Sequence, residues 1–189
     1  EPSRLARLAT DIHDHYVSSC AGDPDRIQKA MVVCSNRKIA YALLQKFKDK
    51  YPEWFEEKKS PDGVSVTEEE LKELKPMPFM AMVSSVGSND EKDMYDYLGG
   101  VKNDKRSEEL DAAFKQEKSN FSIVIVVDMW ITGFDVPCLT YLYNDKPLKK
   151  HLLIQTISRV NRKYPGKEYG MIIDYIGIRD NMREAMKVY

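Results

Sequence analysis

The run from Phe121 to Val127 constrains the fold more than any other segment of this sequence. Its isoleucines and valines follow one another without the polar residue at every second position that marks a strand with one face in water. A strand of this kind is buried on both faces, as in a parallel sheet covered by helices on both sides. We therefore expect residues 121–127 to form a strand that is buried on both faces of a parallel sheet.

Strand-like and helix-like segments alternate along the rest of the chain. Apolar runs predict further strands at 30–34, 79–83, 139–143 and 171–174. Apolar residues at helical spacing predict helices at 4–19, just before Lys29, from about 37 to 47, and at 107–117, 149–163 and 179–188. This order indicates a three-layer α/β fold with a mainly parallel central sheet.

Residues 52–78 interrupt this alternation. Prolines, glutamate-rich runs and a Ser60-Pro61-Asp62-Gly63 turn signal predict a surface insertion. Within it, Thr67 and Glu70 have the spacing of a capping box at the start of a short helix.

Composition limits the kinds of function that the chain can perform by itself. The formal net charge is −1, whereas a self-sufficient DNA-binding module carries a clear basic excess, so nucleic-acid contact would depend on a few placed residues. Cys20, Cys34 and Cys138 are too few and too widely spaced for a disulfide framework, which favours reduced thiols in a cytoplasmic protein. No apolar stretch is long enough to cross a membrane, and His13 and His15 would point apart on a helix, so we expect no metal site.

Polar residues follow the predicted strands, where a parallel sheet gathers its ligands. They are Ser35-Asn36-Arg37, Ser84-Ser85, the segment from Asp128 to Asp135, Asp145-Lys146 and Asp174. Gly133 would allow a ligand to approach the backbone closely, and Asp135 could accept bonds from a ribose, a water or a partner's cation. A tight turn with a capping aspartate is the simpler interpretation of the same residues.

The predicted helix at 149–163 carries a second candidate site. Gln155, Arg159 and Arg162 are spaced i, i+4 and i+7, so they share one face, while Leu153, Ile157 and Val160 form the opposite, apolar face. Two arginines one turn apart without an acidic i±4 partner would suit an anion such as phosphate. A solvated helix face is the alternative.

These segments resemble motifs of superfamily-two helicases and translocases. Thr132-Gly133-Phe134-Asp135 is similar to motif V, residues 155–162 (Gln-Thr-Ile-Ser-Arg-Val-Asn-Arg) to motif VI, and Ser35-Asn36-Arg37 lies where motif IV would be. The run Val-Asp-Met-Trp-Ile-Thr-Gly-Phe-Asp-Val-Pro at 127–137, with Asp-Lys-Pro at 145–147 and Asp-Tyr-Ile-Gly at 174–177, resembles the motor subunit of type I restriction enzymes more closely. The likeness extends over residues 28–180 and implies a RecA-like second motor domain.

The resemblance also implies roles for individual residues. Arg159 and Arg162 would reach the γ-phosphate of ATP, Gln155 would help to position the phosphates or the attacking water, and Gly133 and Asp135 would line the same cleft. Contacts to the DNA backbone would come from Ser35, Asn36, Arg37, Ser84 and Thr132, the last standing where motif V usually has an arginine. The domain would span residues 29–180, with a helical lead-in at 1–28 and the start of a connecting helix at 181–189.

The same resemblance implies partners and limits. ATP and Mg²⁺ would be held mainly by a first motor domain, and the partners would be double-stranded DNA, the other domains of the same subunit, and modification and specificity subunits, with no membrane. The 189 residues contain no Gly-x-x-x-x-Gly-Lys-Ser/Thr phosphate loop and no Asp-Glu-x-His segment, and we identify no nuclease constellation in them. We therefore expect a piece of a longer protein that is catalytically inactive by itself. A non-enzymatic α/β interaction module is the main alternative, and a free-standing doubly wound nucleotide-binding enzyme is a weaker one.

Overall fold

The computed structural model describes residues 2–131, 134–177, 183–184 and 186–187. Its strands are β1 (Lys29–Cys34), β2 (Met80–Met82), β3 (Ile123–Val126), β4 (Leu139–Asp145) and β5 (Met171–Asp174). The α-helices are α1 (Pro2–Ala21), α2 (Arg37–Lys50), α3 (Glu68–Glu73), α4 (Lys92–Tyr97), α5 (Asn103–Lys115) and α6 (Lys150–Val160). Two short 3₁₀ helices, η1 (Pro52–Phe55) and η2 (Gly100–Lys102), accompany them.

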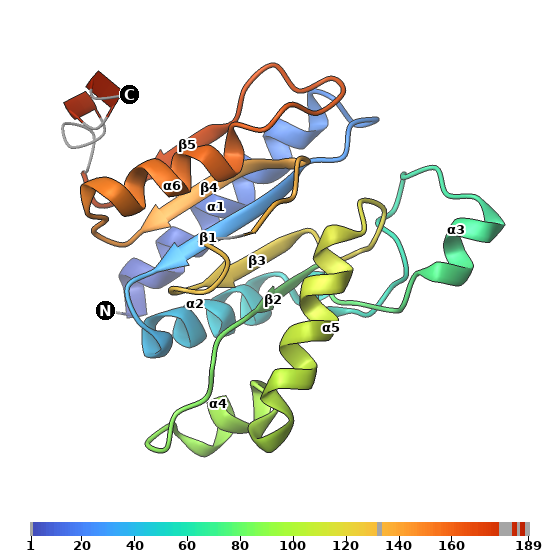
Figure 1. Cartoon of the computed structure of the whole chain (residues 1–189). Helices are drawn as coiled ribbons and strands as arrows, with labels where there is room; N and C mark the ends of the chain where they lie inside the picture. The colour runs from blue at the N-terminus through green and yellow to red at the C-terminus, as the bar shows by residue number, and fades with distance from the viewer. Residues whose placement is uncertain (1, 132–133, 178–182, 185, 188–189) are drawn as a thin grey trace.

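The strands form one sheet in the order β2-β3-β1-β4-β5, and every pairing between neighbours is parallel (Figure 1). In the central strand β1, Val32 lies opposite Ile125 of β3 on one side and Tyr143 of β4 on the other. All residues of β3 are buried, as the unbroken apolar run predicted. The sheet confirms the expected parallel α/β class.

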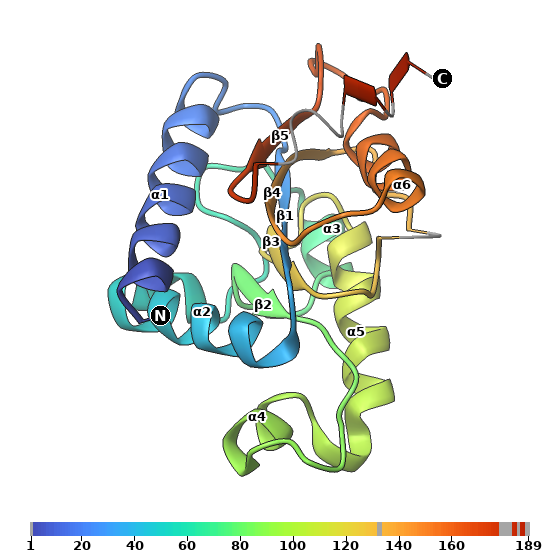
Figure 2. The same ribbon diagram turned by 90° about the vertical axis from the view of Figure 1, so that its left-hand side faces the viewer.

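Helices cover both faces of the sheet, which makes three layers (Figure 2). One face carries Val32, Ile125 and Tyr143, which belong to the same buried cluster as apolar residues of α1 and α2. The other face carries Val33 and Val124, which cluster with residues of α5 and α6 such as Phe114 and Val160. Successive strand residues thus alternate between two apolar layers, which is why no polar alternation was visible in the sequence.

The first helix belongs to the core of this fold. Leu8, Ile12 and Tyr16 of α1 are buried in the cluster that joins α1, α2 and the sheet. Both histidines of α1 have structural contacts. The ring centroid of His13 lies 3.6 Å from that of Tyr51, and His15 Nδ1 lies 2.8 Å from the Tyr143 hydroxyl. None of the described helices is both long enough and apolar enough to cross a membrane.

Three of the predicted elements need correction or limitation. The short helix expected just before Lys29 is wrong, because residues 22–28 form turns in which the Asp23 and Arg26 amides donate to Cys20 and Asp23 carbonyls. The helix expected at 149–163 ends at Val160, where the Asn161 amide caps the Ile157 carbonyl and the chain turns back toward β5. The helix expected at 179–188 falls largely outside the described residues, and 183–184 and 186–187 are helical.

The insertion at 52–78 is only partly a surface segment. The capping box is confirmed, because Thr67 accepts from the Glu70 amide and Glu70 accepts from the Thr67 amide. Trp54, by contrast, is buried against the rings of Phe47 and Phe79, and its carbonyl accepts the Phe79 amide at 2.9 Å just before β2. The insertion therefore starts with a core anchor, whose large apolar side chain the prolines and charges around it had concealed.

Candidate functional site

The carboxyl ends of β1, β2 and β3 meet at one edge of the sheet and bring several predicted residues together. A hollow of about 270 Å³ opens there. It is lined by Ser35, Asn36, Arg37, Val83, Ser84, Ser85, Val127, Asp128 and Met129. Ser35, Asn36, Arg37 and Ser84 are thus neighbours, as their shared position after parallel strands predicted.

Three of these polar side chains also form hydrogen bonds within the fold. Asn36 caps α2 by accepting the Ile39 amide at 2.9 Å. Ser35 Oγ donates to the Asp145 carbonyl at 2.9 Å, and the buried Ser84 Oγ donates to the Ser85 carbonyl at 3.0 Å. The edge is therefore ordered by its own hydrogen bonds before any ligand arrives.

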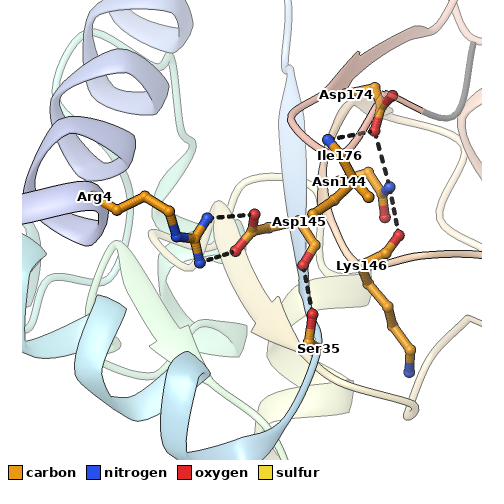
Figure 3. A network of polar contacts seen from close by, with 7 residues as sticks. All are labelled: Arg4, Ser35, Asn144, Asp145, Lys146, Asp174 and Ile176. Carbon is orange, nitrogen blue, oxygen red and sulfur yellow. Dashed lines mark hydrogen bonds and ion pairs between the residues drawn. The ribbon is translucent and has the colours of Figure 1, made fainter. Parts of the chain in front are cut away.

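The end of β4 extends this polar edge (Figure 3). Arg4 of α1 binds both carboxylate oxygens of Asp145, at 2.8 and 3.0 Å. Asn144, which is fully buried, donates to the Lys146 carbonyl at 2.8 Å and to the Asp174 carboxylate at the end of β5 at 3.2 Å. Sequence reasoning missed Arg4, because nothing local signals a partner 141 residues away.

Lys146 connects this network to the segment that follows β3. Its Nζ donates to the Val127 carbonyl at 3.1 Å and forms an ion pair with Asp128. The pairing fixes where the chain leaves β3. Lys146 was visible in the sequence as part of the Asp145-Lys146-Pro147 run, but its partner was not.

Asp135, Arg159 and Arg162 form a second group. Arg159, in the last turn of α6, donates to the Phe134 carbonyl at 2.6 Å, and Arg162 lies 3.2 Å from the Asp135 carboxylate. Arg162 lies beyond the end of α6, so the predicted helical face does not include it, although its ion pair keeps it close to Asp135. Gln155 is exposed on α6, whereas Thr132 and Gly133 fall outside the described residues.

The second group does not lie at the strand ends where Asp135 was expected. Because the strands are parallel, the chain after β3 must cross back to the start of β4, and Asp135 comes just before the turn in which the Leu139 amide donates to the Val136 carbonyl. Helix α6 likewise runs back from the end of β4 toward the start of β5. Its 11 residues span roughly 16 Å, which separates the arginines from the first group.

Trp130 and Phe134 form an aromatic stack between the two groups. Trp130 stacks on Phe134, with ring centroids 4.8 Å apart and planes 8° from parallel, and it also contacts Phe114 of α5. Its φ of 67° lies in the left-handed region, which a bulky residue rarely adopts. Strain of this kind persists where the surrounding packing enforces it, and it clusters at functional sites.

The cysteine at the end of β1 is fully buried. Burial, together with the neighbouring Asp145 carboxylate, raises the pKa of Cys34 to about 12, so its thiol stays protonated and unreactive. Cys20, Cys34 and Cys138 are all free. Within the described ranges, no three histidine, cysteine or acidic side chains gather in a way that could hold a metal ion.

Known proteins resemble this chain over most of its length. The model of the family "Type I restriction enzyme subunit R domain 3" matches residues 26–177. The type I restriction enzyme HindI endonuclease subunit of Haemophilus influenzae is 32% identical over 98% of the chain, which spans 16% of that protein. A protein provisionally named the type I restriction enzyme MjaIXP endonuclease subunit, from Methanocaldococcus jannaschii, is 37% identical over 98% of the chain, which spans 15% of it.

A solved structure shows the same fold. It is a fragment provisionally assigned to the HsdR subunit of a type I restriction enzyme from Vibrio vulnificus, with a TM-score of 0.56 and 17% identity. The match covers 95% of this chain and 29% of the fragment. From its family match over residues 26–177, together with the relatives that are 32% and 37% identical over 98% of its length, the chain belongs to the type I restriction enzyme subunit R domain 3 family.

Proposed function

We propose that this domain is half of an ATP-driven DNA motor within a restriction endonuclease subunit. The observation that carries the proposal is the grouping of Arg159 and Arg162 with Asp135, at a distance from the polar strand ends. One group would meet the nucleotide and the other would meet DNA. The chain spans only 15–16% of the two curated relatives described above, so the activity would belong to a larger protein.

The arginine group fits a phosphate ligand. The side chains of Arg162 and Asp135 are 54% and 53% exposed, and an ion pair in such an environment contributes little stability. A triphosphate could therefore take the place of the Asp135 carboxylate at low cost, since guanidinium groups match the geometry of phosphate oxygens. The hydrogen bond from Arg159 to the Phe134 carbonyl would hold the Arg159 guanidinium in place while the triphosphate binds.

When bound, ATP with Mg²⁺ would supply the transferable phosphoryl group, held mainly by a first motor domain. Arg162 and Arg159 would neutralise negative charge on the γ-phosphate, and Gln155 would help to orient the phosphates or water. Gly133 and Asp135 would line the cleft. Asp135, now paired with Arg162, would be the group that the nucleotide displaces.

The strand-end group suits a sequence-independent contact with double-stranded DNA. Ser35, Asn36, Arg37 and Ser84 are short polar or cationic side chains beside a hollow, and such groups bind phosphate and sugar without reading bases. The net charge of −1 implies that few phosphates are neutralised, so other domains would share the binding. Thr132 would contribute from the segment after β3. Modification and specificity subunits would complete the assembly.

The test is ATP hydrolysis by this chain joined to a domain that carries a phosphate loop. We expect no DNA-stimulated turnover from the chain by itself and clear turnover from the joined protein. Arg162→Ala should lower turnover by roughly 10³ or more, since an arginine finger contributes that much. Lys163→Ala removes an exposed neighbouring cation and should have little effect. Full turnover in Arg162→Ala would overturn the nucleotide role.

A further inference from the structure

The loop from Ser84 to Asp90, which follows β2, is fastened to the start of α2 by one arginine. Arg37 Nη1 donates to the Asp90 carboxylate at 2.6 Å and to the Ser85 carbonyl at 3.1 Å. The same Asp90 oxygen accepts the Gly87 amide at 2.7 Å. Arg37 is therefore tied to the backbone of the loop at two points, directly at the Ser85 carbonyl and through Asp90 at the Gly87 amide.

The opposite side of the loop is also anchored. Asn103, buried at the start of α5, donates to the Ser84 carbonyl and to the Leu98 carbonyl, each at 2.8 Å. The Asp90 side chain is only 4% exposed, which is unusual for a carboxylate and depends on its cationic partner. The loop is thus held in one conformation by hydrogen bonds and by a buried ion pair.

Gly87 is required for this arrangement. A Cβ atom at position 87 would overlap the Arg37 guanidinium, closer than atoms can approach. The obstacle is the far end of a flexible side chain, so an alanine there would push the guanidinium away from Asp90 and leave both charges in the protein. The chain therefore offers a way to open the contact without changing its charge.

The loop presents several exposed polar side chains beside the strand-end hollow. Ser85, Ser88 and Asn89 are exposed, and each can bond to a phosphate oxygen. Arg37 lies between this hollow and a second one of about 560 Å³ lined by Asn36, Arg37, Lys38, Ile39, Asn89, Asp90 and Met94. The loop thus extends the surface assigned to DNA.

We infer that Arg37 is a positioning residue, which sets the 84–90 loop so that Ser85, Ser88 and Asn89 bind the DNA backbone. The inference rests on the proposed DNA contact at this edge, but it changes the role of Arg37, whose guanidinium is engaged by Asp90 and Ser85. It also predicts that Asp90, an acidic residue, supports the binding of a polyanion.

The first experiment measures the loop without DNA. Amide hydrogen exchange at 84–90 should become faster in Arg37→Met, Asp90→Asn and Gly87→Ala. It should stay unchanged in Lys38→Met, which removes an exposed cation next to Arg37, and in Gly22→Ala, where the added Cβ would meet only the Ser19 carbonyl at 3.5 Å. We call Arg37→Met, Asp90→Asn and Gly87→Ala the clamp variants, because each loosens the contact between Arg37 and Asp90. Unchanged exchange in all three would overturn the positioning role of Arg37.

The second experiment follows the amide resonances of the chain during titration with a short mixed-sequence DNA duplex at low salt. Resonances of 84–90 should shift, and the three clamp variants should each bind about tenfold more weakly, as expected for loss of charge-assisted hydrogen bonds. Asp90→Asn decides the question, because removing a negative charge would strengthen binding if charge alone mattered.

The outcomes separate the two proposals. Tighter binding by Asp90→Asn, or weaker binding by Arg37→Met with no loss in Gly87→Ala, would show that Arg37 contacts phosphate directly. That result would overturn the inference and leave the DNA role intact. The absence of shifts at both 35–38 and 84–90 would overturn both.

Discussion

Arg4 and Asp145 form a bidentate ion pair that joins the first turn of α1 to the last residue of β4, 141 residues later in the chain. The Asp145 side chain is 2% exposed and that of Arg4 is 38% exposed, so water screens only one partner. The pair fastens one end of α1 to the edge of the sheet where Ser35 also binds Asp145 (Figure 3).

Loss of Arg4 should therefore cost more than loss of the charge that it balances. Arg4→Met leaves the buried carboxylate of Asp145 without its bidentate cationic partner. We expect the free energy of unfolding to fall by about 2–3 kcal/mol in urea titrations. Asp145→Asn should cost less, because the remaining guanidinium can reach solvent. Equal losses in the two variants would show that burial of Asp145 is not what makes the pair important.

Lys29 should make stability depend on pH in the alkaline range. Its Nζ donates to the Phe114 and Gln116 carbonyls at the end of α5, and burial lowers its pKa from 10.5 to about 8. Between these two values the unfolded chain holds one more proton than the folded chain, so the free energy of unfolding contributed by Lys29 rises with pH. Below pH 8 the lysine is protonated in both states, and the contribution is constant at its lowest value.

The measurement compares the wild type with Lys29→Met, so that the tyrosines and cysteines that also titrate cancel. The free energy of unfolding of the wild type, relative to that of Lys29→Met, should increase by up to about 3 kcal/mol between about pH 8 and 10.5. A difference that does not change over this range would mean that Lys29 keeps its ordinary pKa in the fold.

Trp54 should be essential to stability although it lies in the insertion. The indole packs between Phe47 and Phe79, with ring centroids 5.9 and 5.3 Å away, and Trp54→Ala should lower the free energy of unfolding by about 3 kcal/mol. Leu71→Ala, at a 37% exposed position of the same insertion, should cost much less. Similar small losses in both variants would indicate that the whole insertion is dispensable.

Gly170 should tolerate no side chain. A Cβ there would overlap the backbone carbonyl of Val160, the last residue of α6. A backbone carbonyl cannot relieve the clash by changing rotamer, as a side chain could. We expect Gly170→Ala to cost about 2 kcal/mol and to shift Arg159, so the joined motor should lose turnover beyond its loss of stability. Gly22→Ala is the matched control, and equal behaviour of the two variants would contradict the predicted overlap.

Most of the fold follows from local sequence patterns. The apolar run at 121–127, the alternation of strands and helices, and the Thr67–Glu70 capping box depend on neighbours within a few residues, and the structure confirms each. Ser35, Asn36, Arg37 and Ser84 could be grouped in advance because parallel strands end at a common edge. Periodicity and topology are therefore enough for the architecture and for one of the two candidate groups.

The pairing of charges was decided only by the tertiary structure. Periodicity extended α6 to Arg162, but the return of the chain toward β5 ends the helix at Val160, and an ion pair with Asp135 keeps Arg162 in place. The family resemblance implied a DNA contact for Arg37, and the fold pairs its side chain with Asp90, 53 residues away. Residue types and spacings reveal which groups can bind an anion, whereas the partners they hold depend on distances between segments that no local pattern encodes.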